Sequence, residues 1–167
     1  RTLNEAMKAH ADEIVREGRF QVIWQTGKYY EREMDEFMRG RDARGIWRGA
    51  FIERMDLAYA AADIVVARSG AGTVSELCLV GKAVVFVPSP NVAEDHQTKN
   101  AMALADRGAA LVVPDREAVA RVFSEAGRLL ADDAMRSEME KNIRALAVAD
   151  SADRVADEIL KVVKRSE

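Results

Sequence analysis

A single cysteine and the lack of long apolar runs set the first limits on this 167-residue sequence. Cys78 alone cannot form an internal disulfide, which is compatible with a reducing compartment, and we interpret it as a small core residue. No apolar stretch approaches the ~20 residues that a bilayer-spanning helix needs. The two histidines, His10 and His96, lie far apart without ligand-like spacing, and no Asp-x-Asp motif is present. We therefore expect no disulfide, no membrane helix and no metal site.

The sequence also has no large excess of charge of either sign. The 25 basic and 28 acidic residues give a net charge of -3, so there is no broad electrostatic reason to expect nucleic acid as a partner. Hydrophobic residues make up 49% and charged residues 32%, as in an ordinary globular domain. This length provides one well-buried core, so a single domain is expected.

Apolar periodicity predicts short strands that alternate with helices. Strands are expected over 20–25, 46–50, 62–67, 83–87 and 109–113. Helices are expected over 3–17, 29–39, around 55–58, 73–80, 96–106, 117–130, 134–147 and 152–164. This alternation predicts an α/β fold, with a parallel sheet covered by helices on both faces. Ligands of such sheets bind beyond the carboxyl ends of the strands, where residues 51–52, 68–72 and 88–96 fall.

Residues 62–88 form one strand–loop–helix–strand unit around which the chain is organised. The loop at 69–72, Ser-Gly-Ala-Gly, has no large side chain, so a ligand could approach its backbone closely. Thr73 and Glu76 have the spacing of a capping box, with Thr73 as N-cap and Glu76 at the third helical position. The exposed N–H groups and partial positive charge of a helix start favour a phosphate. A simple tight connection is the alternative interpretation.

Three segments carry a resemblance to a known family: RSGAGTVSE at 68–76, FVP at 86–88 and HQTKNA at 96–101. Together they resemble the nucleotide-sugar half of the MurG family, and the likeness covers nearly the whole chain. Ala83 departs from the family, which usually has proline there. The resemblance implies a Rossmann-like C-terminal domain of a GT-B glycosyltransferase over residues 1–167. It also implies that the first strand, its glycine-rich GGSxGA loop and the N-terminal acceptor domain lie outside this sequence.

The resemblance implies an inverting N-acetylglucosaminyltransferase that converts lipid I to lipid II in peptidoglycan synthesis. The donor would be UDP-GlcNAc, and the acceptor, undecaprenyl-diphosphate-linked muramoyl pentapeptide, would bind through the other half. The enzyme would associate peripherally with the cytoplasmic face of the bacterial inner membrane. Its base would belong to the acceptor half, so no catalytic residue, cofactor or metal is expected here. Alternatives are a diacylglycerol glucosyltransferase, a UDP-GlcNAc 2-epimerase or a non-catalytic nucleotide-binding module.

The resemblance also implies roles for individual donor-site residues. The main chain of Ile52 would pair with uracil, and Arg68 would reach the nucleotide or a phosphate. The backbone at Ala71, Gly72 and Thr73 would face the diphosphate, and Glu76 would accept both ribose hydroxyls. The donor sugar would lie against His96, Gln97 and Asn100. Two of these residues have structural alternatives. Arg68 could pair with a nearby carboxylate, and Glu76 could cap Thr73. For Glu76 we favour the ribose, because capping alone would equally accept glutamine.

Overall fold

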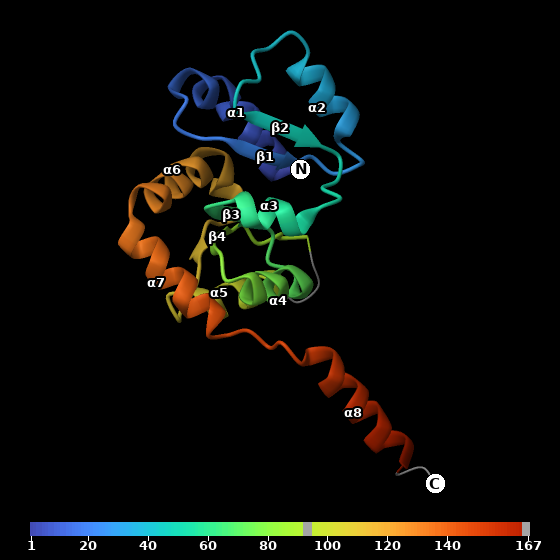
Figure 1. The fold of residues 1–167 in the computed structure, drawn as a ribbon. Helices are drawn as coiled ribbons and strands as arrows, with labels where there is room; N and C mark the ends of the chain where they lie inside the picture. Colours follow the sequence, from blue (N-terminus) through green and yellow to red (C-terminus); the bar gives the residue numbers. More distant parts are fainter. Residues whose placement is uncertain (92–94, 165–167) are drawn as a thin grey trace.

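A computed structural model describes residues 1–91 and 95–164. All five strands that it contains there run parallel. β1 (Val22–Gln25) pairs with β2 (Ile46–Gly49), whereas β3 (Ile64–Ala67), β4 (Ala83–Phe86) and β5 (Leu111–Val112) form a second sheet with β4 in the middle. The five expected strands are therefore confirmed as parallel. Their hydrogen bonding divides into two sheets instead of one continuous sheet. Figure 1 shows β1 and β2 side by side, apart from β3 and β4.

The expected helices are confirmed with small shifts at their ends. They are α1 (Thr2–Glu17), α2 (Glu31–Met38), α3 (Met55–Ala61), α4 (Ala71–Val80), α5 (His96–Ala105), α6 (Ala118–Ala131), α7 (Asp133–Arg144) and α8 (Ser151–Lys164), with a short 3₁₀ helix, η2, at Asp115–Glu117. Gly81 ends α4 in the left-handed conformation, at a φ of 71°, where its N–H donates to the Leu77 carbonyl oxygen. That turn returns the chain directly into β4, so the predicted strand–loop–helix–strand unit is confirmed.

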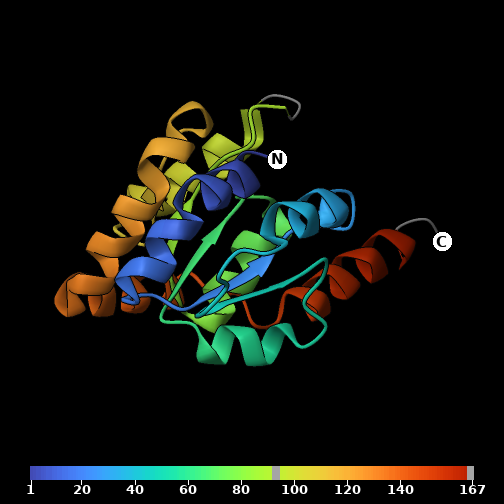
Figure 2. The ribbon, with the colours of Figure 1, turned by 90° about the horizontal axis from the view of Figure 1, so that it is seen from above.

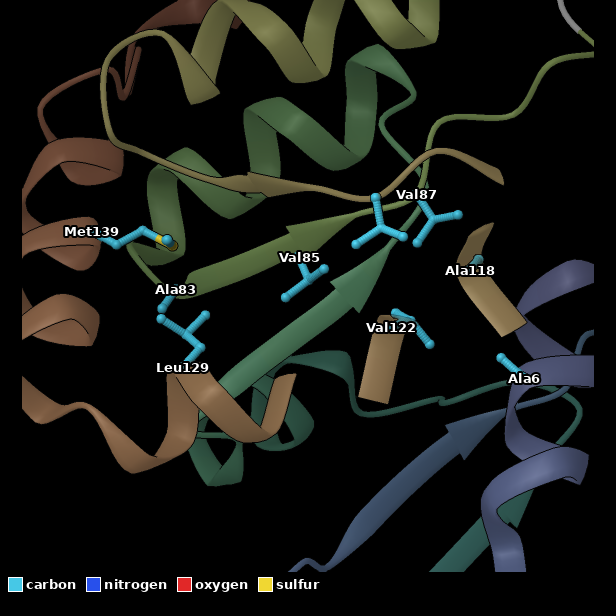
Figure 3. Packing of buried hydrophobic residues seen from close by; sticks show 9 residues of the cluster. Ala6, Ala83, Val85, Val87, Ala118, Val122, Leu129 and Met139 are labelled. Carbon is cyan, nitrogen blue, oxygen red and sulfur yellow. The ribbon is translucent and has the colours of Figure 1, made fainter. Parts of the chain in front are cut away.

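The central strand β4 is buried on both faces, which explains its unbroken apolar sequence. Ala83, Val85 and Val87 point to one face, where they pack with residues of α1, α6 and α7 (Figure 3). Val84 and Phe86 point to the other face, where residues of α4, α5 and α7 cover them. The expectation of helices on both faces of a parallel sheet is thus confirmed.

The sheet of β1 and β2 has its own apolar cluster. Trp24 and Ile46 are buried there against residues of α1 and α2, including Met7 and Met34. Asn4 of α1 supports the same region, because its side-chain oxygen accepts from Trp24 Nε1 at 2.9 Å and its amide nitrogen donates to the Thr26 carbonyl oxygen at 2.8 Å.

Helix α1 also joins this sheet to the second half of the chain. It lies alongside α6 in both views (Figures 1 and 2). His10 Nε2 is hydrogen-bonded to the Val119 carbonyl oxygen at 2.9 Å, and the His10 ring lies 5.1 Å from the Phe123 ring, centroid to centroid. The two sheets are therefore held together by two helices that lie far apart in the sequence.

Helix α8 extends away from the two sheets in Figure 1. No helix in the described part of the chain is long and apolar enough to cross a bilayer.

Cys78 is buried on α4, and that burial raises the pKa of its thiol. Its interpretation as a core residue is confirmed.

Candidate functional site

The carboxyl ends of β3 and β4 meet the first turn of α5, and Ser69 connects them. Ser69 is fully buried, and its hydroxyl donates to the Gln97 carbonyl oxygen at 2.8 Å. The Asn100 amide nitrogen in turn donates to the Ser69 carbonyl oxygen at 3.1 Å. Ser89, just after β4, donates its N–H to the Gln97 side-chain oxygen at 2.9 Å. The sequence-predicted residues Gln97 and Asn100 therefore lie beside the loop that follows β3.

Arg68 is engaged in structural contacts at this edge. Its Nη1 donates to the carbonyl oxygens of Val87 and Pro88 at 2.9 and 3.2 Å, and to Asp115 Oδ1 at 2.5 Å. The two side chains are 28% and 21% exposed, and Thr2 donates to the second oxygen of Asp115. The structural alternative for Arg68 is thus present in the fold. These three bonds all use Nη1. A contact between the other guanidinium nitrogens, Nε and Nη2, and a nucleotide stays a prediction.

The start of α4 differs from the sequence prediction, and the capping box is wrong. Gly70, at φ −62° and ψ 149°, is the N-cap, and the Val74 N–H already donates to the Gly70 carbonyl oxygen at 3.0 Å. Thr73 is therefore helical, whereas an N-cap residue has backbone angles outside the helical region. Glu76 consequently lies in the second turn, where it cannot reach the N-cap N–H. Glycine is itself a favoured N-cap, so the earlier start is compatible with the local sequence.

No side chain caps the start of α4. Its first N–H groups, at Ala71, Gly72 and Thr73, have no partner within the helix. Ala71 and Gly72 are exposed, and a Cβ atom built on Gly70 or Gly72 would meet no other atom within 4 Å. The backbone donors and the positive end of the helix dipole therefore lie uncapped at an exposed part of the chain, which suits an anion.

Gly72→Ala tests whether this site uses backbone groups. Gly72 is helical and its missing Cβ has open space, so alanine should raise the free energy of unfolding by about 0.5–1 kcal/mol. The N–H at position 72 is retained, so if the predicted UDP binds through this N–H, its affinity should stay within about twofold. Urea denaturation and calorimetric titration measure the two effects. A variant no more stable than the wild type would contradict the helical, unobstructed placement of Gly72.

Glu76 is exposed, one turn beyond these donors, and its partner lies on another helix. Tyr59 of α3 donates its hydroxyl proton to Glu76 Oε2 at 3.1 Å. Burial of Tyr59 and, next, the negative charge of Glu76 raise the pKa of the tyrosine to about 12. The tyrosine therefore stays protonated near neutral pH and remains a donor to the carboxylate.

The N-terminus of α5 bears the residues expected to contact the sugar. Asp95 is its N-cap, at a φ of 52°. Its carboxylate accepts from the Thr98 hydroxyl at 2.7 Å, although α5 has no side-chain cap to a backbone N–H. His96 is exposed, whereas Gln97 and Asn100 are half-buried. Sugar contacts by these three residues stay a prediction, and part of the preceding loop, 92–94, lies outside the described residues.

Ile52 lies beyond β2, where a base was expected to meet its main chain. Its N–H donates to Gln25 Oε1 at 3.0 Å, and Gln25 is the last residue of β1. A base that paired with this N–H would replace the Gln25 side chain. The contact between Ile52 and uracil stays a prediction.

Three residues at these strand ends and helices were missed in the sequence: Gln25, Tyr59 and Asp115. Gln25 and Asp115 had a usable signal, because each is a polar residue at or just beyond the carboxyl end of an expected strand. Tyr59 had none, since its partner Glu76 is on a different helix, 17 residues further along.

Two other features of the site region bear on ligands. A hollow of about 370 Å³ lies along β2, and none of the sequence-predicted donor residues lines it. It is lined by Thr26, Glu31, Asp35, Ile46, Trp47, Arg48, Gly49 and Ala50. Across residues 1–91 and 95–164, His, Cys, Asp and Glu side chains form no group of three or more that could hold a metal ion.

Comparison with known proteins supports the sequence resemblance. Residues 1–155 match the family described as glycosyltransferase family 28 C-terminal domain. Two curated relatives, from Parabacteroides distasonis and Porphyromonas gingivalis, are both named UDP-N-acetylglucosamine–N-acetylmuramyl-(pentapeptide) pyrophosphoryl-undecaprenol N-acetylglucosamine transferase. The first is 44% identical over 165 residues, which are 99% of this chain and 45% of that protein. The second is 48% identical over 143 residues, which are 86% and 38%.

Solved structures agree with the relatives. The crystal structure of Acinetobacter baumannii MurG matches with a TM-score of 0.78 at 30% identity, over 96% of this chain and 46% of that one. The glycotransferase of kitacinnamycin, at 18% identity and a TM-score of 0.61, supports the fold alone. The chain spans less than half the length of these relatives. By its sequence match over residues 1–155 and its structural likeness to MurG, this chain belongs to the glycosyltransferase family 28 C-terminal domain family.

Proposed function

We propose that this chain is the donor-binding half of an inverting N-acetylglucosaminyltransferase, which converts lipid I to lipid II at the cytoplasmic face of the membrane. UDP-GlcNAc would bind at the carboxyl ends of β2, β3 and β4. The observation that carries the proposal is the uncapped start of α4, exposed beside two glycines with a carboxylate one turn further on. The names of the relatives support the donor and the acceptor.

Each part of the donor would meet a suitable group. The N–H groups of Ala71, Gly72 and Thr73 would bind the diphosphate, and the positive end of α4 would stabilise the charge that develops on the leaving UDP. Glu76 suits the ribose, because the two oxygens of a carboxylate accept two vicinal hydroxyls in parallel. Ile52 would pair with uracil, and Arg68 would approach the nucleotide. His96, Gln97 and Asn100 would contact the sugar.

The remaining steps would lie outside this chain. The base that deprotonates the acceptor hydroxyl would belong to the acceptor half, which would also bind the undecaprenyl-linked substrate. No cofactor or metal is proposed at the donor site, because the helix start supplies the positive field that a divalent cation would otherwise provide.

Calorimetric titration with UDP tests the proposal. The variant Glu76→Gln should lower UDP affinity by about 1.5–3 kcal/mol, the range for hydrogen bonds to a charged group. Affinity for 2′,3′-dideoxy-UDP, which lacks both ribose hydroxyls, should be nearly the same in variant and wild type. Glu138→Gln, at an exposed glutamate of α7, is the matched control and should change neither affinity.

Two results would contradict the proposal. Equal loss of both ligands in Glu76→Gln would mean that Glu76 shapes the phosphate loop and does not bind the ribose. A strict requirement for Mg²⁺, seen as loss of UDP binding in EDTA, would contradict the metal-free donor site.

A further inference from the structure

The contact between Tyr59 and Glu76 links two helices at the edge of the proposed donor site. Tyr59 is half-buried, and its ring packs against the apolar cluster that contains Leu77, Val84 and Phe86. This packing fixes the ring, while the hydroxyl reaches Glu76 Oε2 at 3.1 Å. Glu76 itself is exposed, so the tyrosine is a rigid partner for a carboxylate that solvent surrounds.

A glutamate in this position would otherwise be poorly ordered. An exposed glutamate side chain populates several rotamers, and a ligand that needs one of them must offset the lost freedom. A single hydrogen bond from a fixed tyrosine selects one orientation before the ligand arrives, which is pre-organisation in the usual sense. The capping role that could have ordered Glu76 is excluded, because the helix begins at Ala71.

The same hydrogen bond leaves room for a ligand. An ionised carboxylate has about four lone-pair sites, and the Tyr59 hydroxyl uses one of them on Oε2. Two vicinal hydroxyls need two more, one on each oxygen. The tyrosine is protonated at neutral pH, so its hydroxyl acts as a donor to Oε2 and leaves the other lone-pair sites of the carboxylate to the diol.

We propose that Tyr59 is a positioning residue that holds the Glu76 carboxylate in the orientation needed to accept a ribose diol. This inference rests on the proposed function, since it assumes that Glu76 binds the ribose. Tyr59 would not touch the nucleotide, and its effect would pass through Glu76 alone. The alternative is a purely structural bond, which only fastens α3 to α4.

The variant Tyr59→Phe separates these roles, because phenylalanine keeps the packed ring and removes only the hydroxyl. UDP affinity should fall about 2- to 12-fold, the effect of one side chain that must be immobilised on binding. Affinity for 2′,3′-dideoxy-UDP should not change. In the background of Glu76→Gln, Tyr59→Phe should cause no further loss, because both changes act through one carboxylate. Tyr30→Phe, at a half-buried tyrosine beside α2, is the matched control and should affect neither ligand.

The outcomes distinguish this inference from the function on which it rests. If Glu76→Gln weakens UDP binding and Tyr59→Phe does not, Tyr59 is structural and the inference is overturned, while the donor site stands. If Tyr59→Phe weakens both ligands equally, its effect does not pass through the ribose and the inference is again overturned. If the wild type binds UDP and 2′,3′-dideoxy-UDP equally well, the ribose role of Glu76 fails, and the inference fails with it.

Discussion

Phe86→Ala is expected to lower the free energy of unfolding by about 3–5 kcal/mol, the usual loss when a buried phenylalanine becomes alanine. Phe86 is fully buried in the central strand β4, where it packs with residues of α4, α5 and α7. The structure around a middle strand cannot collapse into the space that the ring leaves, so a cavity adds to the lost burial. Such a loss is a large part of the stability of an ordinary domain.

Urea denaturation, monitored by circular dichroism, measures this loss of stability. Phe51→Ala is the matched control, since Phe51 is 68% exposed in the segment after β2. Its replacement should cost less than about 1 kcal/mol. Similar midpoints for the two variants would contradict the placement of β4 at the centre of the core.

The second large effect is expected for Arg68→Met. Methionine keeps much of the apolar stem but removes the donor to two carbonyl oxygens and to the partly buried carboxylate of Asp115. Each acceptor left without a partner costs about 1–3 kcal/mol, and partial exposure of the pair reduces the loss. We therefore expect a decrease of about 2–4 kcal/mol in the free energy of unfolding.

Arg32→Met is the control for this prediction. Arg32 pairs with Glu36 one turn away on α2 and is 92% exposed, so its loss should cost less than about 0.5 kcal/mol. Thermal melts of both variants make the comparison. Equal stability of Arg68→Met and wild type would mean that water readily replaces the guanidinium, which would leave Arg68 to a ligand role alone.

The strands were predictable because each one is marked by a run of neighbouring apolar residues in the sequence. Residues 83–87 are apolar without interruption, and a strand with helices on both faces needs that pattern. The division into two sheets was not predictable in the same way. Periodicity identifies a strand, but the pairing of its edges depends on which other strands lie beside it in space.

The start of α4 shows how two local signals can compete. Thr73 and Glu76 match a capping box, whereas Gly70 is also an acceptable N-cap three residues earlier. The sequence does not say which residue leaves the extended conformation first. In the structure the small residues at 70–72 allow the earlier start, and Glu76 moves to the second turn.

The partners of the site residues were beyond sequence reasoning for a different reason. Arg68 bonds to residues 19, 20 and 47 positions away, and two of its acceptors are backbone carbonyls, which every residue carries. Ser69 likewise donates to a carbonyl of α5. Spacing within a motif cannot predict such contacts, because they arise only when separate strands end at the same edge.

The packing of α1 on α6 has a consequence for synthesis on the ribosome. His10 and Val119 are 109 residues apart, and Phe123 of α6 also packs against the cluster that buries Trp24. A nascent chain therefore exposes part of the β1–β2 layer until α6 has also been translated. The β1–β2 layer precedes α6 by roughly seventy residues or more, and until α6 is made its apolar surface is available to chaperones.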